Sequence, residues 1–309
     1  MFHLLRSPSI SVAKRAKQVR LLLRPYSYAA IGNRMQTQDI EDIEIRLLLE
    51  GVFQVYGYDF REYADASLKR RLTLWLQNSG FGSFSEAQGS VLRSRERFSG
   101  LLEGITVNVS EMFRDPQFFK ALREEVVPHL KTYPFIKIWV AGCAAGEEAY
   151  SLAILLCEEG LDGRYRIYAT DINEKVLQQA MEGVYPLERM QQFTQSYQKA
   201  GGKKDFADYY TARYDRAILA KSLKKNIVFA AHNLTVDAGI GEVQMILCRN
   251  LLIYFKPALK ERVLALFDWS LSNGGFLCLG MKETLSGRGI SDRYREVAPR
   301  MRIYRKQYV

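Results

Sequence analysis

The sequence predicts an α/β protein with a mainly parallel sheet, preceded by a small all-helical domain. After residue 105, apolar strand-like runs alternate with amphipathic segments, which is typical of a parallel sheet covered by helices on both faces. One strand joins the following helix through a turn of small residues, in "IWVAGCAAGEEAYSLAILL" at 138–156. Residues 39–105 instead carry apolar residues at helical spacing.

The composition is that of an ordinary soluble protein, with 48% hydrophobic and 25% charged residues. No apolar run approaches the ~20 residues that a membrane-spanning helix needs, so we expect a soluble, cytoplasmic protein. The formal net charge of +10 is concentrated in residues 1–34, which hold seven basic residues and no acid. The remaining residues hold 37 basic and 34 acidic side chains, so no basic stripe predicts a nucleic-acid partner.

Residues 1–38 are expected to form a basic tail outside the folded domains. A basic, acid-free segment of this kind is compatible with a transit peptide. It is also compatible with a translated upstream region ahead of a true start at Met35, and we favour this second interpretation.

The four cysteines, Cys143, Cys157, Cys248 and Cys278, lie in apolar runs without Cys-x-x-Cys spacing. We expect free, buried thiols, as in a reducing compartment. The three histidines form no cluster with them, so no metal site is predicted.

The predicted elements follow in chain order. After Gly104, "TVNVSEMFRDP" precedes a helix that Asp115 can cap and Pro116 can begin. A polar, tyrosine-rich stretch from Arg189 to Lys225 interrupts the later alternation and predicts an inserted subdomain. Buried strands are predicted at the runs "IKIWVAG", "RIYATDI", "NIVFAAHNL", "VQMILCRN", "GGFLCLGM" and "MRIYRK".

The glycine turn is where α/β proteins usually bind a nucleotide, yet its helix opens on Glu147 and Glu148. Two carboxylates at a helix N-terminus would repel the pyrophosphate of NAD or FAD. They suit S-adenosylmethionine, which has no phosphate and carries a cationic sulfonium and ammonium. Both acids could instead only complement the helix dipole. We accept that interpretation for Glu148 and favour a ligand role for Glu147.

Asp171 ends the next predicted strand, 25 residues after Gly146. An acid about 20 residues beyond such a turn binds ribose hydroxyls in dinucleotide folds, and the same geometry serves any adenosine-containing ligand. Asp171 could also cap the helix that follows "TDI". The two roles are compatible, and we favour the ribose role.

Six separated motifs occur in a characteristic order: "NVSEMFR", "AGCAAGEEAYSLA", "ATDINEKVLQQAMEGVY", "HNL", "ILCRNLLIYF" and "GGFLCLG". Together they resemble the chemotaxis-receptor glutamate methyltransferases of the CheR type over about residues 40–305. The resemblance implies S-adenosylmethionine as the cofactor. It also implies a helical domain at 39–105 and a Rossmann-like class I methyltransferase domain at 106–309, with a small β insertion at about 189–225.

The same resemblance implies the site residues. Arg114, which lies beside the transferred methyl group in the family, and Tyr254 are the expected catalytic residues. The sequence departs from the family at Ser110, Met112 and Ala145, where Thr, Phe and a hydroxyl residue are usual, and "GMKETL" replaces "G-H-S-E", which puts a role of that element in doubt. The residues expected to bind the cofactor are Asn108, Ser110, Arg114, Gly142, Glu147, Asp171, Asn233, Leu234, Asn250 and Leu251.

These residue types agree with carboxyl methylation. A glutamate side chain is ionised at pH 7, so its oxygen can attack a sulfonium methyl without a general base. Orientation is then the main requirement. Arg114 can hold the carboxylate with its fork of donors, and Tyr254 can donate a hydrogen bond to it or shape the methyl channel. Each also has a plainer interpretation, as a surface ion pair and a core tyrosine, but the resemblance favours the functional one.

The implied partners are cytoplasmic domains of chemoreceptor-like proteins, bound by a monomer. Lys69, Arg70 and Arg71 resemble the basic face that family members turn toward acidic receptor helices, although a solvated charged face explains them equally well. Two rival functions stay open: methylation of a small molecule or a non-chemotactic protein, and a non-catalytic cofactor-sensing adaptor. The absence of Gly-x-Gly-x-x-Gly disfavours an NAD oxidoreductase. "CRNLLIYF", in place of Asn/Asp-Pro-Pro-Tyr/Phe, disfavours nucleic-acid or amine methylation.

Overall fold

The computed structural model describes residues 37–108, 110–287 and 289–308. The expected basic tail at 1–38 lies outside them, except for the two residues that open helix α2 (Thr37–Tyr56). The chain divides into two units, Met1–Glu44 and Ile45–Val309, and the fold and the site described below belong to the second. Among the described helices, none combines the length and the apolar character needed to cross a bilayer.

The N-terminal region is helical, with α2 followed by α3 (Asp65–Ser79), α4 (Phe84–Arg93) and α5 (Arg95–Ile105). The hydroxyls of Ser83 and Ser94 cap α4 and α5 by accepting hydrogen bonds from backbone amides in the first turns. Apolar residues at helical spacing fill one core, which includes Leu48, Val52, Phe60, Leu72, Phe84, Val91, Phe98 and Leu101.

The C-terminal region is built on a seven-stranded sheet with the strand order β6-β2-β1-β7-β8-β10-β9. The five strands from β6 to β8 are parallel, β10 is antiparallel to β8, and β9 is antiparallel to β10. Their bounds are β1 Ile136–Ala141, β2 Tyr165–Asp171, β6 Ile227–Ala231, β7 Val243–Cys248, β8 Leu271–Leu279, β9 Tyr294–Ala298 and β10 Ile303–Lys306. The expected mainly parallel sheet is therefore confirmed.

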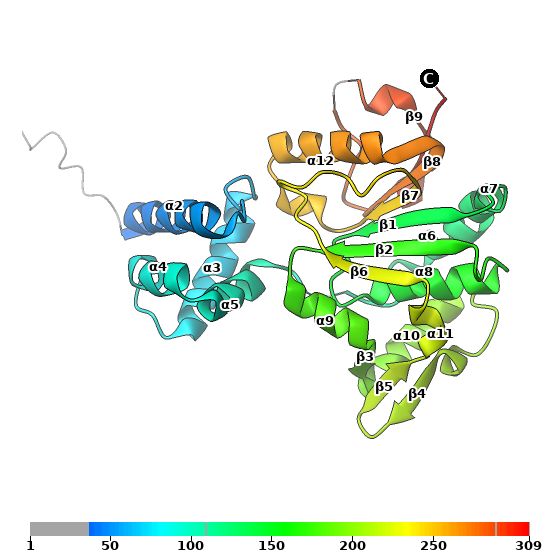
Figure 1. The fold of residues 1–309 in the computed structure, drawn as a ribbon, viewed down its shortest axis with the longest axis horizontal. Coiled ribbons are helices and arrows are strands. Elements are labelled where there is room, and N and C mark those ends of the chain that lie inside the picture. Colours follow the sequence, from blue (N-terminus) through cyan, green and yellow to red (C-terminus); the bar gives the residue numbers. More distant parts are fainter. Residues whose placement is uncertain (1–36, 109, 288, 309) are drawn as a thin grey trace, which may run out of the picture. The chain divides into compact units, whose positions relative to one another are not determined.

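Helices cover both faces of this sheet. Successive residues of β1 point to opposite faces, so Ile138 and Val140 join the core formed with α8 (Glu147–Glu158), whereas Trp139 joins the core formed with α12 (Pro257–Ser270). Figure 1 shows α12 on one face and α8 and α9 (Glu174–Glu182) on the other. Short helical segments complete the main domain: α6 Pro116–Ala121, η2 Leu122–Val126, α7 Val127–Leu130, α11 Lys221–Lys224, η5 Leu252–Tyr254, η6 Ser291–Arg293 and η7 Pro299–Met301.

The chain order creates a switch point next to β1. It runs from β1 outward to β2 and β6, and then crosses back to place β7 on the other side of β1. The carboxyl ends of β1 and β7 therefore flank a crevice, which is where open α/β sheets bind ligands. The glycine turn follows β1, and the "CRN" run begins at Cys248, the last residue of β7.

A small three-stranded antiparallel sheet lies between β2 and β6 in the sequence, with the order β3-β5-β4. Its strands are β3 (Val184–Pro186), β4 (Tyr210–Arg213) and β5 (Arg216–Leu219). The small subdomain also contains η3 (Leu187–Arg189), α10 (Met190–Lys199) and η4 (Phe206–Tyr209). Its first strand starts at Val184, five residues before the expected insertion begins.

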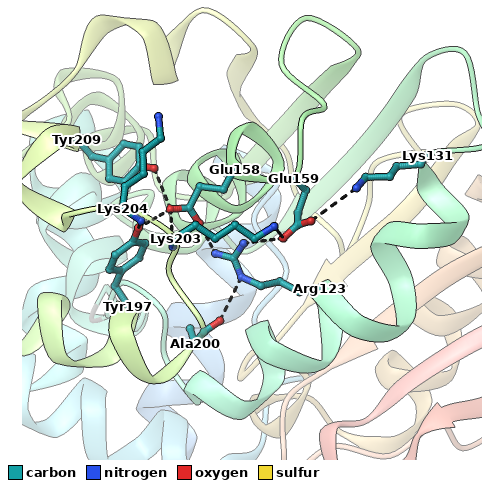
Figure 2. A network of polar contacts seen from close by, with 9 residues as sticks. All are labelled: Arg123, Lys131, Glu158, Glu159, Tyr197, Ala200, Lys203, Lys204 and Tyr209. Atoms are coloured by element: carbon teal, nitrogen blue, oxygen red, sulfur yellow. Dashed lines mark hydrogen bonds and ion pairs between the residues drawn. The ribbon is translucent and has the colours of Figure 1, made fainter.

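A buried carboxylate anchors this small subdomain to the C-terminal end of α8 (Figure 2). The side chain of Glu158 is fully buried and accepts hydrogen bonds from the hydroxyls of Tyr197 and Tyr209, from the Lys203 amide and from Arg123. Burial alone would raise the pKa of Glu158, but the hydrogen bonds, those of Tyr197 and Arg123 foremost, outweigh it and lower the pKa. The network therefore favours the charged form of this buried carboxylate.

Two expectations for this region need correction. No strand was predicted at β9, because the consecutive exposed charges Arg295 and Glu296 interrupt the apolar alternation of a strand. The four cysteines are free, as expected, but Cys157 is only half-buried.

Candidate active site

A cavity of about 510 Å³ opens at the switch point. Its wall comes from five segments: the start of α3, residues from Ile105–Val107 and Ser110–Asp115, the glycine turn with Glu148, the end of β2, and Arg249–Tyr254 after β7. A smaller cavity of about 40 Å³ adjoins it and is lined by Asn233 and Leu234 after β6. The crevice predicted by the strand order is therefore a real cavity.

The glycine turn has a conformation that excludes larger residues at two positions. Gly142 has a φ of 76°, and an added Cβ would lie 2.7 Å from the Leu251 side chain. Gly146 has a φ of 90°, and its Cβ would lie 2.9 Å from that of Ala180. L-residues rarely adopt such angles, so glycine here lets the backbone pass close to the cavity.

Asp171 stands where the turn and the end of β2 meet. One carboxylate oxygen accepts the Ala144 amide at 2.9 Å and the other accepts the Asn173 amide at 3.0 Å. Burial raises the pKa of Asp171, and hydrogen bonds from the backbone of Asn173, Ala144 and Ile172 oppose that effect. The alternative in which Asp171 caps α9 is wrong, because Asn173 caps that helix through the Lys175 amide. Asp171 lines both cavities, where its remaining lone pairs can accept hydroxyl groups.

The two glutamates of the turn have different surroundings. Glu147 is 1% exposed and pairs with Arg189 at 3.0 Å, but its second oxygen, Oε2, is buried without a hydrogen-bond partner among the described residues. Burial raises the pKa of Glu147. Glu148 lines the larger cavity and pairs with Arg249 at 2.6 Å. Glu148 therefore does more than complement the dipole of α8, which was the role expected of it. The expected role of Glu147 in ligand binding stays a prediction.

Arg249 holds the loop that carries Arg114. Its guanidinium is almost fully buried and pairs with both Glu148 and Asp115, the latter at 2.7 Å. It also lies 4.0 Å from the centre of the Phe118 ring. The sequence predicted that Asp115 caps α6, but its side chain makes no capping hydrogen bond, because the carboxylate binds Arg249 instead. Pro116 begins the helix as predicted. The loop is further constrained at Phe113, whose φ is 53° and whose amide donates to Ser151.

Arg114 lies in the wall of the larger cavity. Within the part of the chain that the structure describes, its guanidinium forms no ion pair, whereas Arg249 and Arg189 are both engaged by carboxylates. Arg114 is therefore a cation in this wall that is available to an incoming anion.

Tyr254 lines the same cavity, and the guanidinium of a second arginine, Arg71, lies over its ring. The Arg71 guanidinium lies 4.6 Å from the ring centre and donates to the Ile105 carbonyl at 2.9 Å, while its buried Nε has no partner among the described residues. Arg71 therefore does not belong to an outward basic face with Lys69 and Arg70. It follows the buried Leu68 by three residues on α3, which turns it toward the same side as that residue.

A third carboxylate supports the loop after β7. Glu283 is 3% exposed and accepts the amides of Asn250 at 3.0 Å, Ile253 at 3.3 Å and Gly280 at 2.6 Å. Asn250 has a φ of 61°, so this loop needs such support. The doubtful "GMKETL" element therefore keeps a structural carboxylate at its fourth position.

Most of the predicted site residues come together around the two cavities. Ser110, Arg114, Gly142, Asp171, Asn250, Leu251 and Tyr254 line the larger one, and Asn233 and Leu234 line the smaller one. Asn108 and Glu147 line neither. Sequence reasoning missed Tyr63 and Arg189 and expected Arg71 on an outward basic face, because the positions of all three depend on contacts between distant segments.

The fold and the site together define a class I methyltransferase that uses S-adenosylmethionine. The residues present fit this cofactor: the turn admits a close ligand, Asp171 can accept ribose hydroxyls, and the unpartnered Glu147 oxygen can accept a cationic donor. Residues 108–300 match the family described as CheR methyltransferase, SAM binding domain, and residues 43–106 match CheR methyltransferase, all-alpha domain. The chain belongs to the CheR methyltransferase family.

Individual relatives agree with this assignment. A Pseudomonas putida protein with the provisional name methyltransferase Cher3 is 48% identical, over 88% of this chain and all of that protein. Proteins named chemotaxis protein methyltransferase are 28% identical in Listeria monocytogenes, over 74% of this chain and 85% of theirs, and 31% identical in Vibrio parahaemolyticus, over 66% and 74%. The expected CheR-type chemotaxis methyltransferase, its fold and its cofactor are thereby confirmed.

Proposed function

We propose that this protein transfers a methyl group from S-adenosylmethionine to glutamate side chains of chemoreceptor cytoplasmic domains, forming methyl esters. The observation that carries the proposal is the position of Arg114, a cation without an ion-pair partner among the described residues, in the wall of the larger cavity. The names of the relatives support a chemotactic substrate.

The cofactor supplies an electrophilic methyl group on a cationic sulfur. Asp171 is suited to hold its ribose hydroxyls, and Gly142 leaves room for close approach to the backbone. Asn233 and Leu234 of the adjoining cavity are suited to the base. Glu147 and Glu148 place carboxylates, each paired with an arginine, at the N-terminal end of α8, and this occupation disfavours a phosphate there.

The substrate carboxylate is ionised at neutral pH, so the protein need not remove a proton from it. Arg114 can bind one carboxylate oxygen and leave the other free to form the new bond to the methyl carbon. Because the loop of Arg114 is held by Arg249 to the start of α8, the orientation of this cation is set by the same elements that hold the cofactor. Orientation of this kind can supply much of the rate enhancement.

Tyr254 is the second residue assigned to the reaction. Its ring lies under Arg71, and its backbone carbonyl accepts the Ala64 amide at 2.8 Å, so the start of α3 fixes it at the cavity wall. Its hydroxyl can donate to the substrate carboxylate or narrow the path of the methyl group. Either effect would help to place the reacting groups in line.

The macromolecular partner is proposed to be an acidic helix of the receptor. Arg70 is exposed on α3, the helix whose inward side contributes Arg71 to the cavity wall. A receptor helix bound along α3 would bring a glutamate to the cavity mouth. The protein is proposed to act as a monomer in the cytoplasm, where the cytoplasmic receptor domains lie.

Incubation with labelled S-adenosylmethionine and purified receptor cytoplasmic domains tests the proposal. We expect protein-bound label that mild alkali releases as methanol, because esters hydrolyse under those conditions. Base-stable label would instead indicate another acceptor chemistry. Tight cofactor binding without label on any receptor domain would indicate a cofactor-sensing adaptor.

A further inference from the structure

The small antiparallel sheet contacts the cofactor region at three points. Tyr185 of β3 donates from its hydroxyl to the Ala145 carbonyl in the glycine turn at 2.7 Å. Arg189 of η3 pairs with Glu147 in the first turn of α8 at 3.0 Å. The same guanidinium donates through its other terminal nitrogen to the carbonyl of Ser110, which lines the larger cavity. The small subdomain therefore contacts both the turn and the Ser110 segment of the cavity wall.

The surroundings of Arg189 make this contact a defined one. Its guanidinium lies 4.7 Å from the centre of the Phe193 ring, and its side chain is 29% exposed. The Leu187 amide, two residues earlier, donates to the Asp215 carbonyl at the β4–β5 hairpin at 2.8 Å. The position of Arg189 is thus set from within the small subdomain, although its polar partners belong to the main domain.

Glu147 depends on this arginine for its charge. The carboxylate is 1% exposed, so it has lost almost all contact with water, and an unpaired buried charge is unfavourable. Arg189 provides the one ion pair that Glu147 makes among the described residues. Only Oε1 is used by that pair, and Oε2 stays without a partner in the same part of the chain.

We infer that Arg189 is a positioning residue for cofactor binding, which holds Glu147 as an oriented carboxylate and fixes the Ser110 wall from the small sheet. The inference rests on the proposed role of Glu147 in binding the cofactor. It assigns the small subdomain a function in the methyltransferase site itself. A guanidinium is suited to this role because its planar fork bridges two acceptors in fixed geometry, which an ammonium does not do.

The test is the affinity for S-adenosylhomocysteine, measured by titration calorimetry on the full chain. Arg189→Gln is expected to weaken binding about tenfold, and Arg189→Lys less, because the charge is kept while the fork is lost. Arg216→Gln is the matched control. This arginine lies on β5 of the same small sheet, is 56% exposed and pairs only loosely with Asp215 at 3.6 Å. The affinity of the Arg216→Gln variant for S-adenosylhomocysteine is expected to stay within about twofold of that of the unchanged protein.

A double-mutant cycle separates positioning from general damage. In a Glu147→Gln background the same Arg189→Gln change is expected to cost clearly less affinity, because the partner it orients has already lost its charge. An equal loss in both backgrounds, or an Arg189→Gln affinity matching that of Arg216→Gln, would overturn the inference. If Arg189→Gln lowers the melting temperature so far that binding cannot be measured, Arg189→Lys with and without Glu147→Gln gives the same comparison.

Failure of this inference can be told apart from failure of the proposed cofactor site. Asp171→Asn is expected to weaken binding whether or not Arg189 matters, because it acts at the ribose position. If Asp171→Asn weakens binding and Arg189→Gln does not, the role of Arg189 is wrong and the site stands. If neither change weakens binding, the proposed cofactor site is wrong.

Discussion

Helix α8 begins with Glu147 and Glu148 and ends with Glu158, which Glu159 follows, and the two ends are used differently. At the C-terminal end, Glu158 accepts four hydrogen bonds in a network that includes Arg123 (Figure 2), and these lower its pKa against the effect of burial. At the N-terminal end, Glu147 has one arginine partner and one unpartnered oxygen, and burial raises its pKa.

The difference shows what each end does. A buried carboxylate with every acceptor satisfied stabilises the fold and has nothing left to offer a ligand. A buried carboxylate with one free oxygen costs stability, and such a cost is typical of binding sites. Both ends also touch the small subdomain, through Arg123 and Tyr197 at one end and Arg189 at the other.

The largest expected effect is at Arg114, whose loop is held next to the N-terminal end of α8. Arg114→Ala is expected to lower the rate of methyl transfer to a receptor fragment by about 10²- to 10³-fold, because the substrate carboxylate loses its cation. Affinity for S-adenosylhomocysteine should change little. Single-turnover transfer with alkali-labile label measures the rate, and Arg300→Ala, an exposed arginine of η7, is the control. Undiminished alkali-labile transfer by Arg114→Ala would refute its role.

The next largest effect is expected from substitution of Glu158, at the C-terminal end of α8. Glu158→Ala removes the acceptor of four hydrogen bonds, including one of the two carboxylates that pair with the buried Arg123, and is expected to cost about 3 kcal/mol in the free energy of unfolding. Glu147→Gln should change it by less than about 1 kcal/mol, because the amide oxygen can still accept from Arg189. Urea unfolding followed by circular dichroism measures both. Equal losses would mean that the two ends do not differ as described.

A smaller effect is expected at the end of β2. Asp171→Ala should weaken the affinity for S-adenosylhomocysteine about 10- to 100-fold, the range for hydrogen bonds to a charged group. Asp215→Ala, at an exposed carboxylate of the small sheet, is the control. An unchanged calorimetric affinity for Asp171→Ala would exclude it from the ribose site.

The smallest effect is on the pH dependence of stability. Glu158 has a folded pKa below its unfolded value, so its contribution is present above the unfolded pKa and is lost as the pH falls through the folded one. Glu147 has a raised folded pKa, so stability falls as the pH rises from its unfolded pKa toward its folded pKa. Glu158→Gln should therefore flatten the acid loss of stability, whereas Glu147→Gln should remove the opposite slope. Unfolding free energies between about pH 3 and 7 test whether the two slopes have opposite signs.

Local patterns predicted the parts of this site that lie close together in the sequence. The glycine turn, the first residues of α8 and Asp171 follow buried strands directly, so hydrophobic runs were enough to place them. Arg114 and Tyr254 followed from the family resemblance. Arg189 could not be found in this way, because its partner Glu147 lies 42 residues earlier in the chain and its own surroundings are polar and irregular.

Arg71 and Asp115 are residues for which a local sequence pattern predicted the wrong contact. Each fits a local pattern, a basic run on a helix and a helix cap, but each side chain is used in a contact across the cavity. Long charged side chains can serve either purpose, and only the packing of distant segments decides between them. Glu283 is the converse case, since its spacing from Gly280 was visible but its three backbone partners were not.

Cys143, in the glycine turn, gives the protein a built-in reporter of how often this turn opens. Burial foremost, and then the Asp171 carboxylate, raises the pKa of its thiol well above the usual value, so in the closed turn it is a poor target for alkylating reagents. Each local opening exposes the thiol, and iodoacetamide can then alkylate it irreversibly. Mass spectrometry of the peptide that contains Cys143 would measure the alkylation rate with and without S-adenosylhomocysteine. This rate reports how often the turn opens in the unaltered protein.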